Sequence, residues 1–146
     1  QAFDVALDPQ LHPAPDALAA RLALELKIHE ALDQLDKTIN QAIEVRDRLN
    51  TAIARHTVTG AQAGKAVAQL DQAIGSLVQM HIQSSEGSLL HETRLRSHLA
   101  YLAADIDLAY MQPTPAQYAV FEHLDAQARA GEQTLRTAIA NGNTAL

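Results

Sequence analysis

One helical pattern of about forty residues runs from Asp16 to His56 without a proline or glycine. Such a helix would be about 60 Å long, more than three times the usual number of residues. Nine positions in it alternate in steps of four and three: Ile28, Leu32, Leu35, Ile39, Ala42, Arg46, Leu49, Ile53 and His56. This spacing forms a stripe along one side of the helix, which a partner helix must cover. The pattern therefore predicts a bundle of long helices.

Three shorter helical segments follow and complete an all-α fold. Turn-forming residues at 57–60 and 84–87 separate helices that we expect over about residues 61–83 and 88–111, and a last helix follows Pro113. Short connections favour antiparallel packing of consecutive helices. The prediction is an antiparallel four-helix bundle with one very long first helix, preceded by a short extended segment. Because the first helix is nearly twice as long as the next two, either part of it overhangs or the shorter helices stack along it.

Three helix ends carry recognisable signals. Asp16 is expected to cap the first helix with its carboxylate. In the last helix, Thr114 is the expected cap, Pro115 occupies the first helical position, and Gln117 completes a capping box. A left-handed stop is predicted at Asn141-Gly142-Asn143.

The first fifteen residues differ from the rest of the chain. Residues 3–7 alternate apolar and polar side chains like a short strand, and Asp8-Pro9 ends that pattern. Residues 12–15 indicate an extended linker, because a residue before proline is pushed out of the helical region. We interpret residues 1–15 as a remnant or linker from a preceding β domain, with a ragged terminus as the alternative. Residues 16–146 form the helical bundle domain.

Composition narrows the possible functions. The chain has 146 residues, of which 28 are alanine and none is tryptophan, so its core must be aliphatic. A net charge of −6 argues against nucleic acid as a partner, because binding the phosphate backbone needs clustered Lys and Arg. No apolar run reaches the ~18 residues of a membrane span. With no cysteine, the chain can form neither disulfides nor thiolate metal sites.

Seven histidines raise the possibility of a metal site. A di-metal bundle needs Glu-x-x-His pairs on facing helices, and no glutamate here has a histidine three residues later. Glu25 and His29 are four residues apart, and His91 and His98 are seven apart. His91-Glu92 begins like a zinc-protease helix, but Leu95 replaces the second histidine. We expect solvated histidines, and keep a His/carboxylate metal site as an alternative.

Arg46 is the unusual member of the predicted stripe, because a buried guanidinium needs carboxylate or carbonyl partners. We expect either an ion pair with an acid such as Asp105 or Asp107, or a stripe that turns outward there. An anion or partner site inside the bundle is the functional alternative. Asp33 and Asp36 can lie together, and we interpret them as a solvated helix face rather than an acid–base pair.

No serine lies in a nucleophile elbow, and no glycine-rich sequence forms a phosphate loop. The sequence thus predicts no catalytic, cofactor-binding or metal-ligating residue and no cofactor.

The linear order of these features resembles a known family. Residues 3–10 and 15–18 look like a junction in large bacterial secreted proteins that carry sortilin-like or BNR-repeat β-propellers, often described as glycosyl hydrolases. In that family a strand ends in a "V-x-x-D-P-R" type sequence, and an "S-x-x-D-L" linker leads into a long helix. Residues 43–49 are similar to the family's "I-x-x-x-R-x-x-L" segment. Gln10 replaces the usual arginine.

A later "D-x-x-P-T-x-x-Q" turn of the family looks like Asp107 together with residues 113–117, although the spacing here is longer. The resemblance implies a non-catalytic C-terminal interaction or scaffolding module of a larger protein, secreted or periplasmic. Any glycosidase activity would reside in a propeller that this chain lacks. The implied partners are neighbouring domains of the same polypeptide. Self-association along the long stripe is a further alternative.

Overall fold

A computed structural model of the chain describes residues 12, 14, 16–80, 90–108 and 111–146. Its helices are α1 (Ala17–Ala54), α2 (Gly60–Leu77), α4 (Leu95–Asp107) and α5 (Pro115–Thr144). The described part of the chain contains no strand, so the all-α prediction is confirmed. The expected strand at residues 3–7 and the turn at 84–87 lie outside the described residues.

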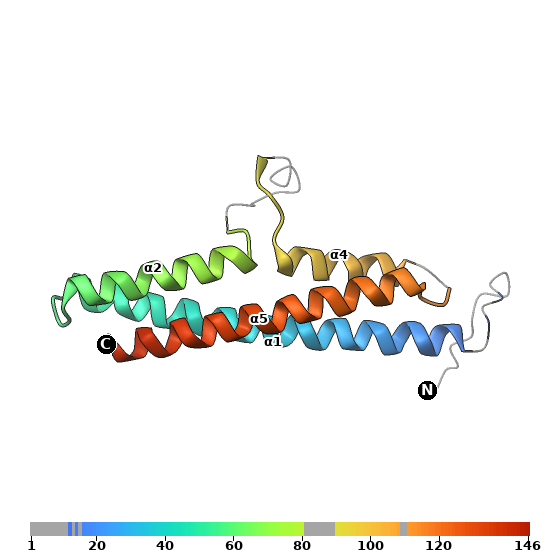
Figure 1. The fold of residues 1–146 in the computed structure, drawn as a ribbon, viewed down its shortest axis with the longest axis horizontal. Coiled ribbons are helices and arrows are strands. Elements are labelled where there is room, and N and C mark those ends of the chain that lie inside the picture. Colours follow the sequence, from blue (N-terminus) through green and yellow to red (C-terminus); the bar gives the residue numbers. More distant parts are fainter. Residues whose placement is uncertain (1–11, 13, 15, 81–89, 109–110) are drawn as a thin grey trace, which may run out of the picture.

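The four helices form an elongated rod (Figure 1). Helix α1, with 38 residues, and α5, with 30, run side by side along it in the same direction. Helices α2 and α4 run in the opposite direction and follow one another along the rod. Ion pairs show their positions, because Asp71 of α2 reaches Arg46 while Asp107 of α4 reaches Arg21. Thus α2 covers the C-terminal half of α1, and α4 covers its N-terminal half.

Each level of the rod therefore holds three helices: α1, α5 and either α2 or α4. The shorter helices stack along α1, which was one of the two expected solutions to its length. In Figure 1, α2 runs antiparallel to α1, and α5 runs antiparallel to α4. Helix α5 instead runs parallel to α1, with Gly142 near the end of α5 packed against Val45. The bundle prediction is thus confirmed at the level of packed helices.

The core is aliphatic, as predicted, because every buried hydrophobic residue in the described part is Ala, Val, Leu or Ile. The buried residues of α1 are Ala17, Leu24, Ile28, Leu35, Thr38, Ile39, Ala42, Val45 and Leu49. The predicted stripe shares Ile28, Leu35, Ile39, Ala42 and Leu49 with this set. The stripe's other positions are only partly buried or, for the last, exposed. Helix α1 packs against helices on two flanks. Its buried face is therefore wider than the predicted stripe, which assumed a single partner helix, and it is centred on different residues.

Several helix ends differ from the prediction. Helix α1 ends at Ala54, and His56, with φ of 55°, is the left-handed residue that turns the chain. Helix α2 ends at Leu77 rather than near residue 83. Helix α4 begins at Leu95, whereas the expected start at residue 88 lies outside the described residues. Leu90, just before it, is 84% exposed.

The capping predictions had different outcomes. The capping box of α5 is confirmed: the backbone N–H of Gln117 donates to Thr114 Oγ1 at 3.2 Å, and the Thr114 N–H donates to Gln117 Oε1 at 2.8 Å. Asp16 precedes α1 but makes no side-chain capping bond, so that prediction was wrong. The left-handed stop at residues 141–143 was also wrong, because α5 continues to Thr144.

The reason for the second error is the packing of Gly142. This glycine is buried and helical, and a Cβ at its position would lie 2.7 Å from Val45 Cγ1. Gly131 makes a similar close approach, since a Cβ added at its position would overlap the Leu77 side chain. These two glycines let α5 approach α1 and α2 closely. They serve the packing of helix against helix and not the ending of α5.

Candidate functional site

The histidines do not assemble into a site. Among the described residues, no group of three or more His, Asp or Glu side chains lies close enough together to hold a metal ion. Glu25 pairs with Arg21 at 3.1 Å, while His29 is exposed. His98 is also exposed, with its Nε2 2.9 Å from Thr93 Oγ1. The pairs that the sequence suggested, Glu25 with His29 and His91 with His98, are therefore not part of a metal-binding cluster among the described residues.

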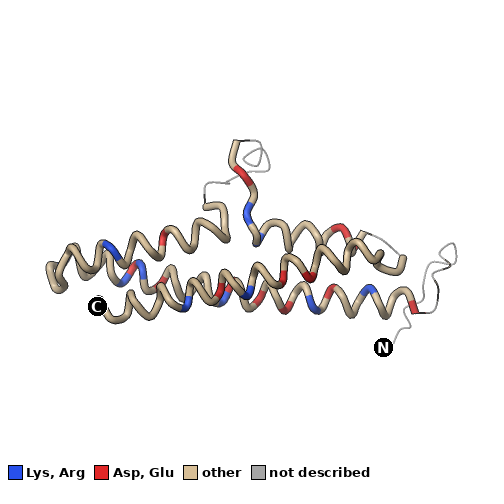
Figure 2. The backbone as a smooth tube through the Cα atoms, in the orientation of Figure 1, with Lys and Arg blue, Asp and Glu red and all other residues tan. Residues whose placement is uncertain are grey.

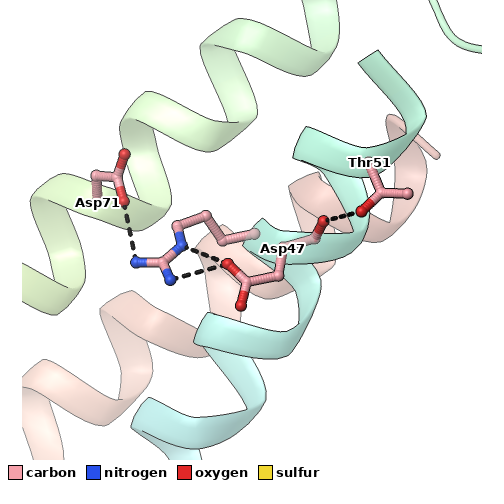
Figure 3. A network of polar contacts seen from close by, with 4 residues as sticks. Asp47, Thr51 and Asp71 are labelled. Carbon is pink, nitrogen blue, oxygen red and sulfur yellow. Dashed lines mark hydrogen bonds and ion pairs between the residues drawn. The ribbon is translucent and has the colours of Figure 1, made fainter. Parts of the chain in front are cut away.

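Arg46 forms an ion pair between two helices. Its Nη2 and Nε donate to Asp47 Oδ1 at 2.8 and 3.0 Å, and its Nη1 lies 3.5 Å from Asp71 Oδ1 of α2. Figure 3 shows Asp47 and Asp71 approaching from these two helices, with Thr51 bonded to the backbone of Asp47. The hydrogen bond with Asp47 raises the pKa of Arg46 above its usual value, against the opposing effect of partial burial.

The ion-pair prediction for Arg46 was right in kind and wrong in partner. Asp105 and Asp107 belong to α4, which packs against the other end of α1. Asp105 accepts a hydrogen bond from Gln117 Nε2 at 2.8 Å. Asp107 lies 3.9 Å from Arg21 Nη2. The two acids thus contact different helices, α5 and α1, because side chains two positions apart on a helix point in different directions.

A second interhelical pair lies where α4 begins. Arg96 Nε and Nη2 donate to the two carboxylate oxygens of Asp36 at 2.7 and 2.8 Å. The bond to Asp36 raises the pKa of Arg96. Asp33 pairs with Lys37 at 2.6 Å on the solvated face predicted for it, whereas Asp36, which was assigned to the same face, bonds to Arg96 of another helix. Sequence reasoning missed the Arg96 pair, because the two partners lie 60 positions apart and only the path of the chain brings them together.

Two surface grooves beside α5 differ in charge. A groove of about 480 Å³ between α1 and α5 has charged walls. Its charged residues are Lys27, Glu30, Asp125, Arg129 and Glu132. A groove of about 450 Å³ between α2 and α5 has no charged residue in its walls. Its polar residues are Gln69, Gln72, Ser76, Thr134, Thr137 and Asn141. In Figure 2 the C-terminal end of α5, after Arg136, carries no charged residue.

No described helix combines the length and the apolar character that crossing a membrane requires. Comparison of the chain with protein families, with curated proteins and with solved structures finds no match. The features that remain as candidates are the ends of the rod, two grooves beside α5, and the interhelical ion pairs of Arg46 and Arg96.

Proposed function

We propose that this chain is a non-catalytic helical scaffolding and interaction module that holds its neighbours apart. The observation that carries the proposal is the parallel course of α1 and α5 along the rod (Figure 1). Because of it, the chain enters the bundle at one end and leaves at the other. An antiparallel bundle with an even number of full-length helices would return the chain to its starting end.

The polar contacts support a structural role for the charged side chains. Arg46 and Arg96 each engage a carboxylate on another helix, the first in the C-terminal half of α1 and the second at the middle of α1. Such pairs fix the register between helices more than they add stability. Both guanidinium groups therefore connect neighbouring helices of the rod. For Arg46 this structural role is preferred over the anion site considered from the sequence.

The wider setting of the module comes from the family resemblance alone. On that basis we place it in a larger secreted or periplasmic BNR-repeat protein, with neighbouring domains of the same polypeptide as its partners. Any glycosidase chemistry would then belong to the propeller, and the rod would set the distance between the propeller and whatever lies beyond the bundle.

A distance measurement tests the spacer role. The chain has no cysteine, so spin labels can be placed at Ala19→Cys and Asn143→Cys, both exposed positions near opposite ends. About 27 residues of helix separate the two levels, which predicts one narrow distance of about 40 Å. The control pair, Ala19→Cys with Ala119→Cys, should give a much shorter distance because α5 starts beside α1. A broad or short distance for the first pair would contradict the proposal.

Self-association is a second candidate, favoured by the uncharged groove between α2 and α5. The chain has a net charge of −6, so two copies repel each other over most of their surface. The groove has no charged residue, and two copies can therefore face each other there without charge repulsion. Light scattering at high concentration should then give the mass of a dimer. Thr137→Glu in the groove should yield a monomer, and Ala140→Glu outside it should not. A monomeric parent chain excludes this candidate.

A further inference from the structure

The third helix of the rod is interrupted at the middle of the rod. Helix α2 ends at Leu77 and α4 begins at Leu95, so among the described helices only α1 and α5 cross this level (Figure 1). On one side of the interruption, the Leu77 side chain packs against Gly131 of α5. On the other side, Arg96 of α4 pairs with Asp36 of α1. We call this level the mid-rod level.

The parallel register of α1 and α5 shows which of their residues lie at the mid-rod level. Gly142 of α5 packs against Val45 of α1. Gly131 and Gln34 each stand eleven residues earlier in the same two helices, and the equal rise of the helices keeps them at one level. The groove between α1 and α5 agrees, because Gln34 and Glu132 both line it. The turns of α1 and α5 that follow Gln34 and Gly131 therefore cross the mid-rod level together.

Helix α1 has an unusual residue in this turn. Thr38 is the one polar residue that is buried in the described part of the chain, and its hydroxyl donates to the carbonyl oxygen of Gln34 at 3.0 Å. A threonine that bonds back to the carbonyl four residues earlier slightly destabilises a helix and often bends it. The exposed Thr51 and Thr137 make the same bond, but their hydroxyls have water as an alternative partner. The buried hydroxyl lacks that alternative, so α1 bends more easily here than a helix without such a bond.

Helix α5 has a weak turn at the same level. Gly131 is a poor helix former, and glycine is a common place for a helix to kink. A larger residue at this position would overlap Leu77. One turn later, the Thr134 hydroxyl donates back to the carbonyl oxygen of Ala130 at 3.1 Å. Both helices that cross the mid-rod level thus carry features that favour bending.

One ion pair opposes bending at this level. Arg96 lies in the first turn of α4, and its Nε and Nη2 donate to the two carboxylate oxygens of Asp36 at 2.7 and 2.8 Å. A bidentate pair fixes the relative direction of its two groups as well as their distance. Asp36 stands between Gln34 and Thr38, so the pair ties α4 to the turn of α1 that bends most easily.

We propose that the rod has a joint at the mid-rod level and that the Asp36–Arg96 pair holds this joint closed. The joint consists of residues 34–38 of α1 and 130–134 of α5. When the pair is released, the two helices bend there and the two halves of the rod tilt as rigid units. As a regulatory device the joint rests on the spacer role proposed above, because bending changes the distance between the neighbours of the rod.

Distances between spin labels test the joint. The pair Ala19→Cys with Asn143→Cys spans the joint, and Ala19→Cys with Ala126→Cys lies within the N-terminal half. In the Asp36→Asn variant, the distance across the joint should become broader and shorter than in the parent, while the distance within the half stays the same. Asp71→Asn is the matched control: it removes the same charge from the Arg46 pair, away from the joint, and should change neither distance.

A second substitution tests the role of Thr38. In the Asp36→Asn background, Thr38→Val keeps the branched shape and removes the hydroxyl that bonds to Gln34. This change should make the distance across the joint narrower again. Circular dichroism of each variant verifies that the helices remain.

The outcomes separate the joint from the spacer role. An Asp36→Asn protein as narrow across the joint as the parent would overturn the joint and leave the spacer role intact. A broadened distance within the N-terminal half would also overturn it, because α4 would then detach and the halves would not tilt as units. A parent protein that is already broad across the joint contradicts both the spacer role and a closed joint.

Discussion

At the scale of single residues, the closest packing in the rod depends on positions without a side chain. Gly142 is surrounded by Val45, Leu70 and Leu49, each of which a Cβ would approach within 3.4 Å. The nearest atom belongs to valine, whose β-branched side chain has little freedom to move aside. By contrast, a Cβ at Gly75 would meet nothing within 4 Å.

We predict opposite effects for the same substitution at these two glycines. Gly142→Ala gains up to about 1 kcal/mol of helix propensity but costs about 1–3 kcal/mol through overpacking. The net result should be a free energy of unfolding lower by about 1 kcal/mol. Gly75→Ala, the matched control, should raise it by about 0.5–1 kcal/mol. Urea unfolding followed by circular dichroism measures both, and a stabilised Gly142→Ala protein would show that α5 does not pack as described.

At the scale of helices, the beginnings of α5 and α1 provide a contrast. Thr114 accepts a hydrogen bond from an otherwise unpaired amide, and Gln117 returns one to the Thr114 backbone. Asp16 has a residue type that caps helices equally well, yet its side chain makes no capping bond. The type of the N-cap residue alone therefore did not predict whether its side chain makes a capping hydrogen bond. The full motif, with Pro115 and Gln117 in place, did.

Alanine substitutions should reproduce this contrast. Thr114→Ala should lower the free energy of unfolding by about 1 kcal/mol, because an amide of the first turn loses its partner. Asp16→Ala should cost only the few tenths of a kcal/mol that a negative charge contributes near a helix start. Thermal melts at matched ionic strength can compare the two variants. Equal losses would mean that Asp16 caps α1 after all.

At the scale of the whole molecule, the stacking of α2 and α4 along α1 makes a rod in place of a compact bundle. A compact chain of 146 residues has a radius of gyration of about 15 Å. A rod as long as α1, about 57 Å, gives roughly 18 Å. Small-angle X-ray scattering should yield the larger value, with a distance distribution that has a long tail. A symmetric distribution and a value near 15 Å would contradict this architecture.

The sequence predicted the helices better than it predicted their arrangement. Periodicity is a local property, so Ile28, Leu35, Ala42 and Leu49 were correctly assigned to the core. The direction of α5 and the partner of Arg46 depend on how the chain returns along α1, which no short window contains. The Arg96–Asp36 pair could not be predicted for the same reason as the direction of α5, because its partners lie far apart in the sequence.

The parallel pairing of α1 with α5 has a consequence during synthesis. Val45 and Gly142, which touch in the finished rod, leave the ribosome about a hundred residues apart. At ordinary translation rates, the flank of α1 that packs against α5 stays exposed for about 5–20 s before α5 is synthesised. During that time α2, and later α4, can pair with α1, but the third side of each half remains apolar and open. Helix α5, which follows the other three in the chain, closes the core along the whole rod. Termination before α5 would therefore release a nascent chain with a long exposed apolar surface.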